Sequence, residues 1–145
     1  MKIDFYILEA ASGQKSLHFA CQLLEQAYAD KQRVYVNASS REEAERLDAL
    51  LWTYRDDSFI PHNLYHPVED HPPPIQIGHD TAPDNHNGVL INLSREVPAF
   101  YSRFNHLIEI VLSDPVVQQL ARTRYKQYRD QGHEIKTIKV KANEI

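Results

Sequence analysis

Histidines are the residues of this chain whose number and spacing first suggest chemistry. His62 and His66 lie four residues apart, and His71, His79 and His86 follow with several carboxylates nearby. A zinc ion needs three or four such ligands at about 2 Å in a fixed geometry. Prolines interrupt this stretch, so no regular helix is expected to hold two histidines on one face. We therefore expect polar residues of a surface loop here, and no metal site.

Motifs for a nucleophile or a bound phosphate are equally weak. Cys21 falls among Phe19, Leu23 and Leu24 in a predicted helix, where a small buried thiol is the ordinary outcome. No serine has the Gly-x-Ser-x-Gly surroundings of a hydrolase nucleophile. Residues 12–16 (Ser-Gly-Gln-Lys-Ser) occupy the place of a P-loop but lack its upstream glycine, which predicts a turn with a serine helix cap. We expect no catalytic residue and no cofactor.

A stripe of cationic and aromatic residues near the C-terminus is the stronger candidate for a site. Within the predicted helix over residues 115–131, positions three or four residues apart share a face. Arginine beside an aromatic ring can bind a carboxylate and an apolar side chain together. The alternative, which the residue types alone slightly favour, is a solvated basic helix face. The stripe consists of Gln118, Arg122, Tyr125 and Arg129, with Lys126 beside it.

Trp52, the only tryptophan, is followed closely by a loop that contains Phe59, Ile60 and Pro61. Large apolar groups in such a segment either pack beneath the loop into the core or lie exposed as an anchor for a partner. Residue types alone favour core packing.

The order of predicted elements indicates an α/β domain. Apolar runs predict strands over residues 3–8 and 34–38, and helical spacing predicts helices over 17–30, capped by Ser16, and 41–52. This alternation is typical of a parallel sheet. Further strands are predicted at 75–77, 89–93 and 107–112, with an exposed edge strand at 134–140. Residues 53–64 are predicted as a loop, residues 98–104 as a short helix, and Gly132 as the end of the last helix.

Composition fits one domain over residues 1–145. Hydrophobic residues make up 42% and charged residues 25%, which is ordinary for a globular chain. One cysteine permits no intrachain disulfide, and neither a signal peptide nor a membrane-spanning apolar run is visible. We expect a cytoplasmic protein.

Charge is distributed unevenly along the chain. Residues 1–114 hold nine Lys and Arg against 17 Asp and Glu, a net charge of −8. Residues 115–145 hold seven against three, a net charge of +4. An acidic body with a basic C-terminal element suits local binding of an anionic partner and repels bulk polyanion.

Five segments, in order along nearly the whole chain, resemble a known family. They are residues 5–8 (Phe-Tyr-Ile-Leu), 46–52 (with Arg-Leu-Asp and Leu-Trp), 58–64 (Ser-Phe-Ile-Pro-His-Asn-Leu), 89–94 (Val-Leu-Ile-Asn-Leu-Ser) and 120–129 (Leu-Ala-Arg-Thr-Arg-Tyr-Lys-Gln-Tyr-Arg). The family is that of the chi subunits of bacterial DNA polymerase III holoenzyme, which are part of its clamp-loader complex.

The resemblance implies a non-catalytic adaptor with an open, mostly parallel, twisted Rossmann-like sheet, helices on both faces and no nucleotide site. It also implies a surface for the acidic, phenylalanine-ended C-terminal tail of single-stranded DNA-binding protein. By motif match that surface includes Arg122, Tyr125 and Lys126. A second implied surface, which includes Trp52 and Phe59, binds the psi subunit of the clamp loader or, in some members, a competing helicase. DNA is then contacted only indirectly, and no membrane is involved.

The chain departs from the family in places, and alternatives remain open. Familiar members carry lysine where this chain has Gln118, so one cation of the tail surface is missing, and Arg129 is a candidate replacement. Residues 65–87 resemble nothing known. The divergent end beyond Gly132 adds three lysines, Lys136, Lys139 and Lys141.

A second hypothesis is direct binding of single-stranded nucleic acid by the basic C-terminal helix and strand. The acidic remainder of the chain and the few aromatics available for stacking disfavour it. A third hypothesis is metal-dependent hydrolysis at the histidines.

Overall fold

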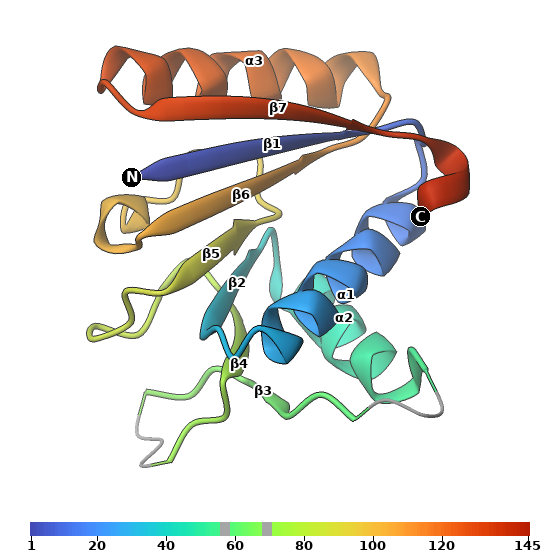
Figure 1. Cartoon of the computed structure of the whole chain (residues 1–145), viewed down its shortest axis with the longest axis vertical. Helices are drawn as coiled ribbons and strands as arrows, with labels where there is room; N and C mark the ends of the chain where they lie inside the picture. Colours follow the sequence, from blue (N-terminus) through green and yellow to red (C-terminus); the bar gives the residue numbers. More distant parts are fainter. Residues whose placement is uncertain (56–58, 68–70) are drawn as a thin grey trace.

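The computed structural model describes residues 1–55, 59–67 and 71–145, and these form an open, parallel sheet with helices packed against it (Figure 1). Seven strands lie in the order β3-β4-β2-β5-β6-β1-β7, and every adjacent pair is parallel. The predicted open parallel sheet is therefore confirmed. The strands are β1 (Lys2–Leu8), β2 (Val34–Ala38), β3 (His62–Leu64), β4 (Ile75–His79), β5 (Val89–Asn92), β6 (His106–Val111) and β7 (Glu134–Val140).

Three α-helices occur in the described residues, α1 (Gly13–Ala29), α2 (Arg41–Thr53) and α3 (Pro115–Asp130). Each begins after a residue whose side chain accepts a backbone N–H of the first turn. The cap of α1 is Ser12 rather than Ser16, so the helix begins a turn earlier than predicted. The Ser16 hydroxyl instead donates to the Gly13 carbonyl. After α3 comes Gly132, as predicted, at a φ of +84° that favours glycine.

The central segments depart from the predicted elements. Residues 62–64, predicted as loop, form β3 because they pair with β4, where His62 lies opposite Ile75. The helix predicted over 98–104 is only a 3₁₀ turn, Tyr101–Arg103, and a second such turn covers Ala142–Glu144. No helix of the described residues is long and apolar enough to cross a membrane.

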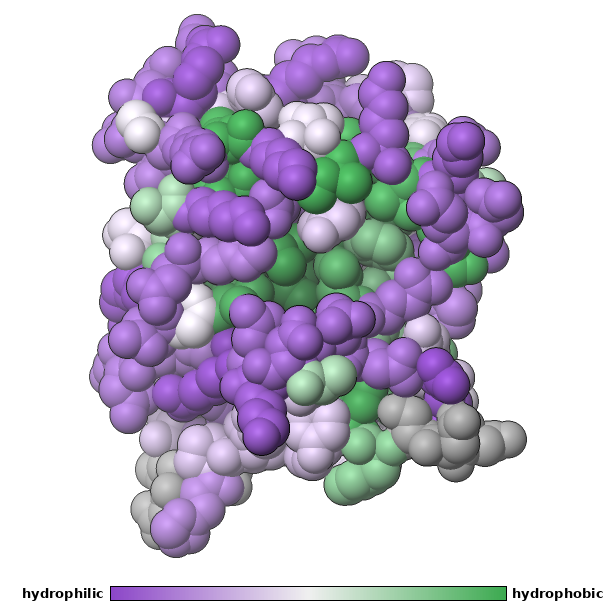
Figure 2. All heavy atoms as spheres, viewed as in Figure 1, coloured by the Kyte–Doolittle hydropathy of each residue, from purple (hydrophilic) through white to green (hydrophobic). Residues whose placement is uncertain are grey.

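Side chains alternate between two hydrophobic clusters, one on each face of the sheet. Along β6, Leu107 and Val111 belong to one cluster and Ile108 and Ile110 to the other. The helices α1 and α2 cover the second of these faces, and α3 covers the first (Figure 1). Helices on both faces are thus confirmed. Figure 2 shows apolar residues toward the middle of one view of the molecule, with hydrophilic side chains around them.

Candidate partner-binding sites

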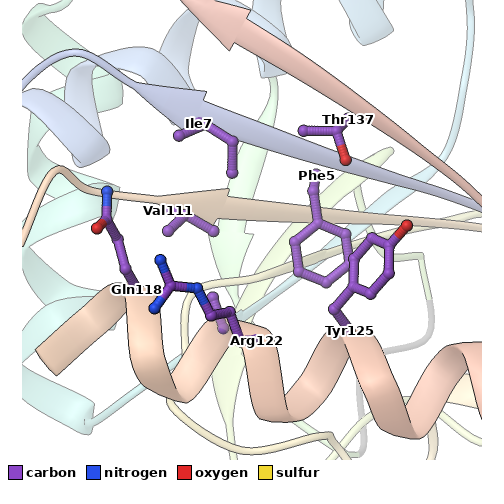
Figure 3. A pocket seen from close by; sticks show the side chains of 8 residues that line it. Phe5, Ile7, Val111, Gln118, Arg122, Tyr125 and Thr137 are labelled. Atoms are coloured by element: carbon purple, nitrogen blue, oxygen red, sulfur yellow. The ribbon is translucent and has the colours of Figure 1, made fainter. Parts of the chain in front are cut away.

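A small apolar pocket lies between α3 and the sheet (Figure 3). Its volume is about 190 Å³. An apolar cavity of about 150 Å³ holds one benzene molecule, so this pocket has room for a single aromatic side chain. It is lined by Phe5 and Ile7 of β1, Val111 of β6, Thr137 of β7, and Gln118, Ala121, Arg122 and Tyr125 of α3.

The alternation of side chains along β1 and the helical spacing along α3 bring these residues together. Alternate residues of a strand share a face, so Phe5 and Ile7 both project from β1 toward α3. On α3 the lining residues form two pairs four residues apart, Gln118 with Arg122 and Ala121 with Tyr125, which places them on one side of the helix. Ala121 stands in the middle of this stripe, and its small side chain leaves the space that forms the pocket. The Tyr125 ring closes one end against Phe5, with 5.4 Å between ring centroids.

Positive charge lies at the mouth of the pocket. Arg122 is exposed and lines it, whereas Lys126 and Arg129 are exposed on α3 but lie outside its lining. Among the described residues no carboxylate pairs with Arg122 or Lys126, while Arg129 Nε lies 3.8 Å from the Asp130 carboxylate. Of the predicted stripe, the structure thus brings Gln118, Arg122 and Tyr125 into one pocket and leaves the other two beside it. The Arg122 guanidinium is available to an outside anion.

The other side of α3 is held by a buried polar network. Arg124 Nη2 lies 3.1 Å from Glu109 Oε1, and both side chains are almost fully buried. Tyr128 Oη donates to Glu109 Oε2 at 2.6 Å, and Asn92 Nδ2 donates to the same oxygen at 3.0 Å. Burial raises the pKa of Glu109, and Arg124, Tyr128 and Asn92 oppose that rise. The network fixes how α3 is rotated, and therefore which of its cations face outward.

This network was not predicted from the sequence, where Arg124 counted only as one of the seven cations of residues 115–145. Its side chain faces the sheet and donates to the Arg95 carbonyl at 2.9 Å. The signal was present in the sequence, because Glu109 interrupts an otherwise apolar strand. A carboxylate at such a position requires a buried partner.

A second candidate surface is an exposed aromatic pair at the end of α2. The side chains of Trp52 and Phe59 are 55% and 65% exposed, and their ring centroids are 5.7 Å apart. The Trp52 ring also packs on His62, at 4.6 Å. The prediction from residue types that these aromatics pack in the core is therefore wrong. Ile60, which follows Phe59 in sequence, is buried in the core, and Pro61 is partly buried.

The five histidines of this stretch differ in exposure. His66 and His71 are exposed, His79 at the end of β4 is partly buried, and His62 and His86 are buried, which corrects the prediction that all belong to a surface loop. His62 Nδ1 lies 2.6 Å from the Ile60 carbonyl and Nε2 lies 3.1 Å from the Asp48 carbonyl, so this ring ties α2 to β3. Among the described residues no three His, Cys, Asp or Glu are grouped to hold a metal ion.

The Cys21 thiol is also unsuited to chemistry. It is fully buried in α1, as predicted, and burial raises its pKa to about 12. A thiol of that pKa is almost entirely protonated near neutral pH and is a poor nucleophile.

Comparison with known proteins gives consistent results over nearly the whole chain. The family model described as "DNA polymerase III chi subunit, HolC" matches residues 1–136. A Pseudomonas aeruginosa protein named DNA polymerase III subunit chi is 36% identical over 132 residues, which are 91% of this chain and 92% of that protein. Proteins of the same name from Haemophilus influenzae and Escherichia coli are 32% and 28% identical, covering 94% and 92% of this chain and 96% and 94% of theirs.

Proposed function

This chain belongs to the family of DNA polymerase III chi subunits, which are accessory subunits of replication, and we propose that it is a non-catalytic adaptor with two partner surfaces. One surface binds the acidic, phenylalanine-ended C-terminal tail of single-stranded DNA-binding protein. The other binds the psi subunit of the clamp loader, or a helicase in its place. The adaptor works in the cytoplasm at the replisome.

The observation that carries the tail site is the pocket between α3 and the sheet. Its apolar lining and its volume of about 190 Å³ suit one phenylalanine ring. Arg122 at the mouth is placed to bind the terminal carboxylate of the same residue, and Lys126 and Arg129 lie farther along the helix for acidic residues upstream. A hydrogen bond to a charged group contributes roughly 1.5–3 kcal/mol. A few of these with one buried ring reach about −8 kcal/mol, which is near-micromolar affinity.

The psi site is supported by the exposure of Trp52 and Phe59. Two large aromatic rings in contact with each other at the surface leave much apolar area in water. Aromatic side chains of this kind are the usual anchors of protein interfaces. Pro61 adds a partly buried neighbour, and Ile60 supports the loop from below.

The tail site is tested by fluorescence anisotropy of a labelled acidic peptide ending in phenylalanine. We expect saturable binding with a Kd in the micromolar range, weakened about tenfold or more by Arg122→Ala. The matched control is Arg46→Ala, which removes an exposed arginine of α2 and should change the Kd less than twofold. Absence of saturable binding by the native protein at low salt would overturn the tail site. Tighter binding of a naked single-stranded oligonucleotide than of the peptide would favour the nucleic-acid hypothesis instead.

The psi site is tested by titrating labelled psi subunit with the native protein and its variants. Truncating an interface hot spot costs about 2 kcal/mol or more, so Trp52→Ala and Phe59→Ala should each weaken binding about thirtyfold. Val116→Ala is the control, because Val116 is 60% exposed but lies in the first turn of α3. Unchanged psi affinity in both aromatic variants would contradict the assignment.

A further inference from the structure

The edge strand β7 places a lysine beside the pocket that the stripe on α3 does not include. In the sheet register Ile7 lies opposite Val111 of β6 on one side and Lys139 of β7 on the other. Paired residues of neighbouring strands project from the same face of a sheet. Ile7 and Val111 both line the pocket, and Lys139 continues their row to the edge of the sheet, beside the pocket but outside its lining.

The pocket itself offers little charge for an acidic ligand. Among its lining residues Arg122 is the charged one, and the α3 residue one turn before it is the neutral Gln118. A peptide that ends in phenylalanine brings its terminal carboxylate and further carboxylates upstream. Arg122, Lys126 and Arg129 all lie on α3, so they offer positive charge from one side of the pocket only.

Lys139 is free to supply the missing charge. It is exposed, and no carboxylate of the described residues forms an ion pair with it. Within the described part of the chain β7 is an edge strand that pairs with β1 alone, so its outer side is open to an approaching chain. The long flexible stem of lysine allows its ammonium group to reach over a pocket mouth from a neighbouring strand.

We propose that Lys139 is a second cation of the tail site, so that an acidic peptide is held between Arg122 on α3 and Lys139 on β7. This inference rests on the proposed function and specifies how that pocket recognises its ligand. It adds to the cations of α3 one cation on the opposite side of the pocket.

The same strand offers a matched control. Lys136 is also exposed, but the register places it opposite Asp4. Successive side chains of a strand point to opposite faces of the sheet, so Asp4 faces away from the pocket that Phe5 lines. Its paired residue Lys136 therefore projects from the α1 face rather than the pocket face. Lys136→Gln and Lys139→Gln therefore remove the same charge from the same strand on opposite sides of the sheet.

The test measures anisotropy of the labelled acidic peptide ending in phenylalanine with native protein, Lys139→Gln, Lys136→Gln and Arg122→Ala. Lys139→Gln should weaken binding about three- to fivefold, as expected for an exposed ion pair, and Lys136→Gln less than 1.5-fold. Adding Gln118→Lys to Lys139→Gln should restore most of the loss. Circular dichroism of each variant confirms that the fold is retained.

A second peptide, in which amides replace the upstream side-chain carboxylates, tests the charge recognised. Lys139→Gln should change the affinity of that peptide less than it changes the affinity of the acidic one. Equal affinities of Lys139→Gln and Lys136→Gln for the acidic peptide, with Arg122→Ala still impaired, would overturn this inference and leave the proposed function standing. No binding by the native protein would overturn both.

Discussion

The two faces of the sheet are covered in different ways. On one face α1 and α2 pack over an aliphatic cluster that includes Leu24, Leu47 and Ile77. On the other face α3 and loop residues pack over an aromatic cluster, with the buried Glu109–Arg124 pair beneath the helix. On the side of α1 and α2, the aromatic pair Trp52 and Phe59 is left exposed at the end of α2. On the side of α3, a pocket lies between the helix and the sheet.

The width of α3 and the position of its buried anchor explain why a pocket forms. A helix with its side chains is about 10–12 Å across, and strands are about 4.8 Å apart, so one helix covers roughly two strands. Glu109 lies on β6, and its bonds to Arg124 and Tyr128 hold α3 above that strand. The pocket remains between α3 and strands β1, β6 and β7, where Ala121 presents only a methyl group toward the sheet (Figure 3). A pocket with cations at its mouth and an exposed aromatic pair suit partners of different chemistry.

The largest expected effect contrasts two neighbours in sequence, Ile60 and Phe59. Ile60 is 2% exposed, so Ile60→Ala should lower the free energy of unfolding by about 2–5 kcal/mol. Phe59→Ala should lower it by less than about 1 kcal/mol, because the ring is mostly in water. Urea denaturation of both variants measures the difference. Equal losses would mean that Phe59 belongs to the core and is not available to a partner.

Much of the fold could be predicted from sequence because its signals are local. The strand over 34–38 was predicted with its observed bounds, and Pro115 and Gly132 marked the ends of α3. The three residues of β3 carry no pattern of their own, because only pairing with β4 makes them a strand. Ser16 was predicted as the cap of the first helix, but the hydrogen bonds show Ser12 as the cap, while the Ser16 hydroxyl donates to the Gly13 carbonyl.

The candidate sites were predictable in part for the same reason. Helical spacing alone placed Gln118, Arg122 and Tyr125 on one face of a helix, and the structure supplies the strands that complete the pocket. Whether Trp52 is buried or exposed depends on what packs above it, which no local pattern records. The contribution of Lys139 depends on a register between strands more than a hundred residues apart in sequence.

The next largest effect is a pH dependence of the folding stability, caused by His86 in the aromatic cluster of the α3 face. The His86 ring packs against Phe104, with centroids 5.1 Å apart, and is 1% exposed. Burial first, and the nearby Arg33 charge second, lower its pKa to about 4. Between pH 6.5 and 4 the unfolded chain therefore binds a proton that the folded chain does not. Stability must fall as the pH is lowered through that window.

Between pH 7 and 5 this loss should amount to about 2 kcal/mol, at 1.36 kcal/mol for each unit of pKa difference. Urea denaturation of the native protein and of His86→Asn at both values isolates the contribution of this residue, since the carboxylates titrate in both proteins. An unchanged difference between pH 7 and 5 in the variant would show that His86 does not cause it.

A smaller effect is expected from the polar network that positions α3. Tyr128→Phe removes one donor to the Glu109 carboxylate and should destabilise the protein by about 1–2 kcal/mol. The control is Tyr101→Phe, because Tyr101 lies 3.1 Å from His133 Nε2 and is only partly buried. Thermal unfolding of the two variants should therefore differ clearly. A loss no larger than that of the control would mean that the network does not hold the helix.

The smallest effect, a response to salt, separates the two surfaces most directly. Exposed charges are screened over about 10 Å at 0.1 M ionic strength and over about 3 Å at 1 M. Binding at the pocket depends on Arg122 and its neighbours. Raising NaCl from about 0.05 M to 0.5 M should therefore raise the Kd of the acidic peptide about fivefold, which corresponds to roughly 1 kcal/mol of binding free energy. Binding at Trp52 and Phe59 depends on apolar area and should change less than twofold. Parallel titrations of the peptide and of psi measure both responses in one protein, and an equal salt dependence would mean that the two surfaces do not recognise partners of different chemistry.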